Sequence, residues 1–88
     1  MVKDIQKVVD NKEWQKLRES MEGTWTSKKN AEENIKRLRK YVGNTRDMDK
    51  IRRVQNYLAA LRGIDNKYPV IKRYRKQIKR KRRSIKNN

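Results

Sequence analysis

The residues best equipped for chemistry in this sequence are arginines and lysines crowded near its C-terminal end. Nine of the twelve positions from 72 to 83 are basic, and residues 66–88 include no acid. The basic positions are Lys72, Arg73, Arg75, Lys76, Lys79, Arg80, Lys81, Arg82 and Arg83. Because an arginine can donate two parallel hydrogen bonds to one phosphate, this tract indicates a polyanion-binding segment. The pattern does not say which polyanion is bound.

A second basic set lies upstream, between residues 36 and 53. It consists of Lys36, Arg37, Arg39, Lys40, Arg46, Lys50, Arg52 and Arg53. All of these positions fall outside the apolar faces of the helices predicted below. If those helices pack antiparallel across the short turn at residues 43–45, we expect the set to form one continuous nucleic-acid-binding surface.

Aromatic rings could add base stacking to the phosphate contacts. Trp25 and Tyr74 are the candidates, although packing against the core is the preferred interpretation for Trp25. Trp14 is predicted to be a core residue because it shares an apolar face with Leu17 and Met21. The tyrosines are expected to rest their rings at the core margin with their hydroxyl groups outward.

Catalytic chemistry has few candidate residues. The chain has no histidine and no cysteine, so acid–base or nucleophilic catalysis would depend on carboxylates, lysines and tyrosines. Of the closely spaced acids, Asp47 and Asp49 suit a helix N-terminus, and Glu19 and Glu22 suit an exposed helix surface. No metal-ligand spacing, phosphate-binding loop or nucleophile motif is present. We therefore expect a protein that is not an enzyme and that uses no metal or cofactor.

The charge of the chain is large and unevenly distributed. Its 88 residues include 27 lysines and arginines against 10 acids, a formal net charge of +17. Residues 1–33 hold seven basic and seven acidic side chains, so the whole excess lies in residues 34–88. Because such charge repels itself, it indicates a negatively charged partner.

Sequence features also bear on where the protein acts. No window is long and apolar enough for a signal peptide or a membrane span, and the absence of cysteine suits a reducing compartment. We expect an intracellular protein, cytoplasmic or associated with a nucleoid or nucleus, and not a secreted one.

Apolar residues recur at helical spacing in four segments. They are Trp14, Leu17 and Met21; Ala31, Ile35, Leu38 and Val42; Met48, Ile51, Val54, Leu58 and Leu61; and Val70, Tyr74 and Ile78. The spacing predicts helices over 11–22, 28–42 and 46–62, and a fourth that begins at Pro69 and loses its apolar stripe after Ile78. Upstream, residues 5–9 could form another turn or two of helix, with the chain bending at Asp10.

Residues that begin and end helices lie at the edges of these segments. The candidate N-caps are Asp10, Ser27 and Thr45, and Glu13 would complete a capping box with Asp10. Glycines at positions 23, 43 and 63 are typical of helix stops. No segment alternates apolar and polar residues as a strand would. The prediction is an all-α fold, a small bundle of three to four short helices.

The predicted domain covers residues 1–78, and residues 79–88 are predicted to be a basic tail that frays until it meets an anion. The preferred function is binding of DNA or RNA, with neither favoured. The alternative is a small basic effector, of the kind that viruses and phages make as accessory proteins, that binds an acidic surface of a larger protein or ribonucleoprotein. Membrane attachment is disfavoured because the basic segment has few large apolar residues to insert.

Overall fold

The computed structural model describes the backbone of residues 2–87 and the side chains of residues 11–85. Within these limits every regular element is an α-helix, which confirms the predicted all-α class. The helices are α1 (Val2–Met21), α2 (Lys28–Val42), α3 (Met48–Ala59), α4 (Ile64–Lys67) and α5 (Pro69–Asn87).

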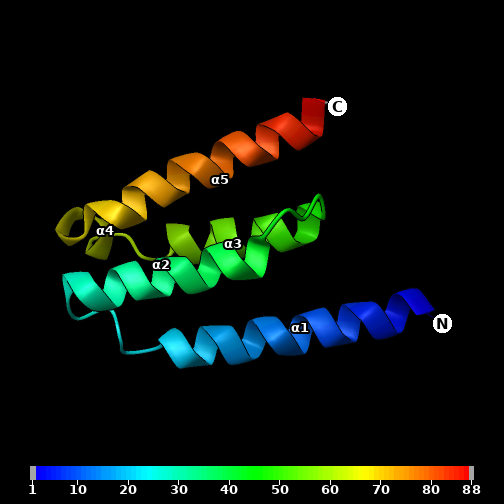
Figure 1. The fold of residues 1–88 in the computed structure, drawn as a ribbon, viewed down its shortest axis with the longest axis horizontal. Helices are drawn as coiled ribbons and strands as arrows, with labels where there is room; N and C mark the ends of the chain where they lie inside the picture. The colour runs from blue at the N-terminus through cyan, green and yellow to red at the C-terminus, as the bar shows by residue number, and fades with distance from the viewer. Residues whose placement is uncertain (1, 88) are drawn as a thin grey trace.

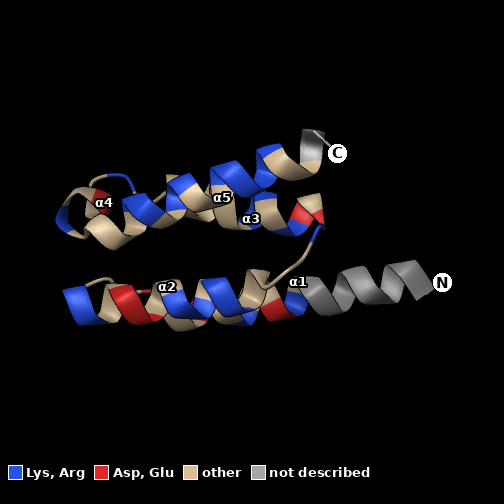
Figure 2. Ribbon diagram, turned by 45° about the horizontal axis from the view of Figure 1, so that its top comes forward, with Lys and Arg blue, Asp and Glu red and all other residues tan. Residues whose placement is uncertain are grey.

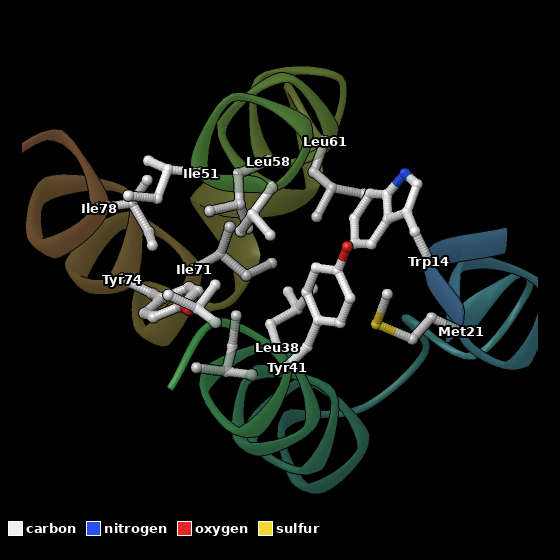
Figure 3. Packing of buried hydrophobic residues seen from close by; sticks show 13 residues of the cluster. Trp14, Met21, Leu38, Tyr41, Ile51, Leu58, Leu61, Ile71, Tyr74 and Ile78 are labelled. Carbon is white, nitrogen blue, oxygen red and sulfur yellow. The ribbon is translucent and has the colours of Figure 1, made fainter. Parts of the chain in front are cut away.

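The four longer helices form an up-and-down bundle. α1 and α3 run in one direction and α2 and α5 in the other, while α4 is a single turn that leads from α3 into α5 (Figure 1). Seen along the helices, α1 and α5 lie on opposite sides of the core, with α2 and α3 between them (Figure 3). α5 is therefore flanked by α2 on one side and α3 on the other.

The boundaries of α2 are those predicted, for the predicted reasons. Ser27 caps its start, and the Ser27 hydroxyl oxygen accepts a hydrogen bond of 3.1 Å from the Asn30 amide. At its end Gly43 has a φ of +52°, which a residue with a Cβ adopts only with strain, and its amide donates to the Arg39 carbonyl at 2.7 Å. The chain can therefore turn sharply toward α3.

The start of α3 differs from the prediction by two residues. Its cap is Asp47, whose carboxylate accepts a hydrogen bond from the Asp49 amide at 3.0 Å, so the prediction of Thr45 as the cap is wrong. The Thr45 hydroxyl oxygen instead accepts from the Asp47 amide at 3.1 Å. Each short polar side chain thus satisfies the amide two residues later, and the second of them directly precedes the helix.

The predicted bend at Asp10 is also wrong, because α1 continues through this position from Val2 to Met21. No glycine or proline interrupts these residues, and each further residue adds a backbone hydrogen bond to a helix already begun. An aspartate inside a helix costs only about 0.7 kcal/mol or less, which is too little to break it.

The predicted third helix over 46–62 is shorter in the structure and is followed by α4. Gly63, with a φ of +93°, precedes this turn. Its amide donates a hydrogen bond of 3.1 Å to the carboxylate of Asp65, which is only 6% exposed. Asp65 therefore stabilises the connection between α3 and α5, and so short an element has no periodic pattern by which it could be predicted.

The core is formed by the predicted apolar stripes except at Met48, which is only half-buried, and with two changes on α5. Ile71 is fully buried whereas Val70 is only half-buried, and Ile85 packs against the core beyond Ile78. The apolar seam of α5 therefore continues two turns past the predicted end, at positions 71, 74, 78 and 85. α5 is helical to Asn87. That residues 79–88 lose helical structure part of the time in solution, until an anion binds, stays a prediction.

Candidate nucleic-acid interface

α5 turns most of its basic side chains away from the core. Ile71, Tyr74 and Ile78 are buried at i, i+3 and i+7, so the positions between them face outward. The exposed cations are Lys72, Arg73, Lys76, Lys79, Arg80 and Arg83, whereas Arg75, Lys81 and Arg82 are half-buried. Basic residues recur along most of the described part of α5 (Figure 2).

The three half-buried cations fasten α5 to its neighbours. Arg75 forms a salt bridge of 2.9 Å with Asp65, and Arg82 donates a hydrogen bond of 2.7 Å to the Gln55 side-chain oxygen on α3. Lys81 Nζ donates to the Gly43 carbonyl at 3.3 Å. In the structure these contacts position α5; that the three residues also bind nucleic acid stays a prediction.

Four of the outward cations lie in a row along the helix. Lys72, Lys76, Lys79 and Arg83 follow at intervals of four, three and four residues, which places them on one line of the α5 surface. We call this set the cationic row. It spans about 16 Å of helix at 1.5 Å per residue.

The cationic row borders a groove between α3 and α5. The groove has a volume of about 370 Å³ and is lined by Lys72, Arg75, Lys76 and Lys79 of α5 and by Gln55, Leu58 and Ala59 of α3. None of these lining residues is acidic. An anion in the groove would therefore meet the charges of Lys72, Lys76 and Lys79, whereas the charge of Arg75 is paired with Asp65.

A second groove, of about 460 Å³, separates α5 from α2. Its charged lining consists of Lys28, Glu32, Lys36, Arg39 and Arg73. The Arg39 guanidinium carbon lies 5.5 Å from the centre of the Tyr74 ring, and Arg39 also donates to the Gln77 side-chain oxygen at 3.3 Å. This groove is also basic, but Glu32 reduces its charge.

The upstream basic set faces more than one neighbouring helix. α2 and α3 do pack antiparallel, but Lys36 and Arg39 face α5, whereas Arg37 and Lys40 line a groove toward α1 that also holds Glu13. Residues one apart on a helix face in directions about 100° apart, so the two pairs border different neighbours. That the set forms one continuous nucleic-acid-binding surface stays a prediction. Only the α5-facing pair adjoins the α5 cations.

The α3 members of the set lie on different sides as well. Lys50 Nζ lies 4.4 Å from the centre of the Tyr41 ring, and Arg53 donates to the Tyr41 hydroxyl at 3.5 Å. Both are therefore directed toward α2. Arg46, in the turn before α3, and Arg52, on α3, are exposed.

Neither candidate for base stacking presents an open ring beside these cations. Trp25 is half-buried, and its indole nitrogen donates to the Tyr57 hydroxyl at 2.9 Å. Tyr74 is 3% exposed, and its hydroxyl oxygen has no hydrogen-bond partner among the described residues. Burial raises the pKa of Tyr74 to about 12. The expectation of an outward hydroxyl group is wrong for this residue.

Three residues near the cations were not predicted. Lys28 lines the α2–α5 groove, and Gln55 and Gln77 accept hydrogen bonds from Arg82 and Arg39. Lys28 could have been predicted, because it lies eleven residues, or about three helical turns, before Arg39 and therefore on the same side of α2. The glutamines carry no sequence signal, because any exposed helix position can hold one.

Within the part of the chain that the structure describes, no helix has the length and apolar character needed to cross a bilayer. In the same part, no three His, Cys, Asp or Glu side chains are grouped as metal ligands. Comparison of the chain with protein-family models, curated proteins and solved structures finds no match.

Proposed function

We propose that this protein binds nucleic acid without catalysing a reaction on it, through contacts between α5 and phosphate groups. The observation that supports the proposal is the outer surface of α5, where six exposed cations follow one another with no acid in the helix. Phosphate contacts of this kind supply most of the affinity of non-specific nucleic-acid binding.

The energetics of α5 agree with an anionic ligand. Lys72 and Lys76, like Lys79 and Arg83, are separated by one helical turn, and each such like-charge pair destabilises a helix by about 0.2–0.5 kcal/mol. A bound phosphate chain would remove this repulsion and add attraction. Binding should therefore also raise the melting temperature of the protein.

DNA and RNA both satisfy this proposal, since both present phosphates at close intervals. The test is fluorescence anisotropy with labelled DNA and RNA at several salt concentrations. We expect binding that persists at about 150 mM salt and weakens with a log–log slope of about −0.9 per phosphate neutralised on B-DNA.

The alternative is an acidic protein as the ligand of the same cations. The α3–α5 groove, lined by these cations and by the exposed Ala59, would suit an acidic helix. If binding to every nucleic acid vanishes near about 150 mM salt while a stoichiometric complex with one acidic protein survives, this alternative replaces the proposal.

A further inference from the structure

We infer that the ligand is a double-stranded nucleic acid rather than a single strand, and that one phosphate backbone of the duplex lies along the cationic row beside the α3–α5 groove. This inference rests on the proposed function and specifies its substrate class. Three features carry it: the straightness of the row, its fixed position on the bundle, and the location of the aromatic rings.

The cationic row suits a ligand whose phosphates are already ordered. Its four charges occupy one line over about 16 Å of helix, a length along which one strand of a duplex presents a phosphate about every 3.4 Å of axis. A duplex holds these phosphates in a regular array, so little entropy is lost when several contacts form together. A single strand would have to be straightened first.

The row is also held firmly in place. Arg82 binds Gln55 of α3, Arg75 binds Asp65, and Lys81 binds the Gly43 carbonyl. Beneath the row, Ile78 is buried and Ile85 packs against the core. These contacts alternate along α5 with the members of the row, so the backbone that carries the four cations is fixed to the bundle. Rigid placement favours a rigid partner.

The aromatic rings are located where they cannot assist a single strand at this row. Proteins that bind single strands without sequence preference combine a positive groove with rings on which bases stack. Here all six rings lie in the described part of the chain. Trp14, Tyr41 and Tyr74 are buried, and Trp25 and Tyr57 bond to each other. Tyr68 is half-buried in the groove on the α2 side.

The first experiment compares ligands that carry similar numbers of phosphates. The probes are DNA and RNA duplexes of about 20 base pairs and an unstructured thymidine oligomer of about 40 nucleotides, at about 150 mM salt. We expect at least one duplex to bind about tenfold or more tightly than the oligomer, because the oligomer must be ordered on binding and finds no ring at the row on which to stack. Equal or tighter binding of the oligomer overturns the inference and leaves the proposed function intact.

The second experiment tests the row itself. Lys72→Gln, Lys76→Gln, Lys79→Gln and Arg83→Gln are combined in one variant. Its affinity for the duplex should fall by on the order of 10²–10³, and its log–log salt slope should lessen by about three to four. Because like-charge repulsion is removed, its helical circular dichroism and melting temperature should be maintained or raised.

A matched control removes four exposed cations elsewhere, by changing Lys12, Lys16, Lys29 and Arg62 to Gln. It has the same net charge as the row variant. Charges more than about 8 Å from a phosphate are largely screened at physiological salt, so its affinity should fall by less than about tenfold. Equal losses in the two variants would show that net charge, and not the row, determines binding. If the unaltered protein binds none of the three probes, the proposed function is refuted instead.

Discussion

The α1 side and the α5 side of the bundle differ in the side chains that they bury and in their charge. On the α1 side Trp14 lies between two tyrosines, with ring centres 5.3 Å from Tyr41 and 5.7 Å from Tyr57. On the α5 side most buried residues are aliphatic, namely Ile51, Val54 and Leu58 of α3 and Ile71 and Ile78 of α5, with Tyr74 as the one buried ring of α5 among the described residues (Figure 3). Residues 11–22 hold equal numbers of acidic and basic side chains, whereas α5 holds ten basic and no acidic ones.

This difference separates the residues that hold the fold from those that carry its charge. Large aromatic rings bury much apolar surface per residue, so a few of them can stabilise the α1 side of the bundle. The helix surface on this side is nearly neutral. On the opposite side a narrow seam of three isoleucines and Tyr74 anchors α5, and most of the remaining circumference carries cations. Substitutions on the two sides should therefore affect stability and binding differently.

The largest expected effect is that of Trp14→Ala. Trp14 is 8% exposed and touches rings of both α2 and α3, so its loss should lower the free energy of unfolding by about 3–5 kcal/mol. Urea denaturation followed by circular dichroism measures this. Trp25→Phe is the control: it removes one hydrogen bond at a half-buried site and should cost about 1 kcal/mol. Similar losses in the two variants would contradict the special role of Trp14.

A smaller effect is expected for Asp65→Asn, which separates stability from binding on the α5 side. The buried carboxylate accepts hydrogen bonds from Arg75 and from the Gly63 amide, so the change should lower the free energy of unfolding by about 1–3 kcal/mol. Duplex affinity should stay the same or rise, since Arg75 is released. Glu32→Gln, at an exposed position, should change stability by less than about 0.5 kcal/mol. Weakened duplex binding by folded Asp65→Asn protein would show that the ion pair itself serves the ligand.

The smallest effect concerns Tyr74→Phe and depends on pH. The Tyr74 phenol has a pKa of about 12 in the folded chain and 10.0 as its ordinary value, so ionisation favours the unfolded chain. Its stabilising contribution is complete below pH 10 and is lost as the pH rises toward 12. At about pH 11 the unaltered protein should have lost about 1 kcal/mol relative to the variant.

Near neutral pH the same variant should be as stable as the unaltered protein or more stable by about 1 kcal/mol, because the buried hydroxyl oxygen has no described hydrogen-bond partner. Parallel urea titrations at neutral and alkaline pH give both comparisons. A clear destabilisation at neutral pH would reveal a hydrogen bond to Tyr74 in solution.

Much of the fold could be predicted because the signals were local. Ser27 and Gly43 delimit α2 by their own backbone chemistry, and Pro69 suits the first turn of α5. α4 was not predicted because it depends on a hydrogen bond from the Gly63 amide to the Asp65 side chain. A single contact of this kind produces no periodic pattern in the sequence. The end of the α5 seam was misplaced because Ile85 is isolated among basic residues.

The candidate site was only partly predictable. The tract on α5 is evident from composition, but which cations face outward depends on the partners of the others. Arg82 and Gln55 are distant in the sequence, so their hydrogen bond cannot be inferred from spacing. The division of Lys36 from Arg37 likewise follows from the placement of α1 and α5 on opposite sides of α2.

The seam of α5 has a consequence for how this protein can change. Ile71, Ile78 and Ile85 recur every seven residues and, with Tyr74, form the line of apolar side chains that secures the helix. Apart from Arg75, Lys81 and Arg82, which bond to neighbouring elements, most other described positions of α5 are exposed and open to replacement. The strength of binding can thus be varied one outward residue at a time while the fold is preserved. A library randomised at the four positions of the cationic row should yield mostly folded proteins with graded affinities, and mutational tolerance along α5 should alternate with a seven-residue period.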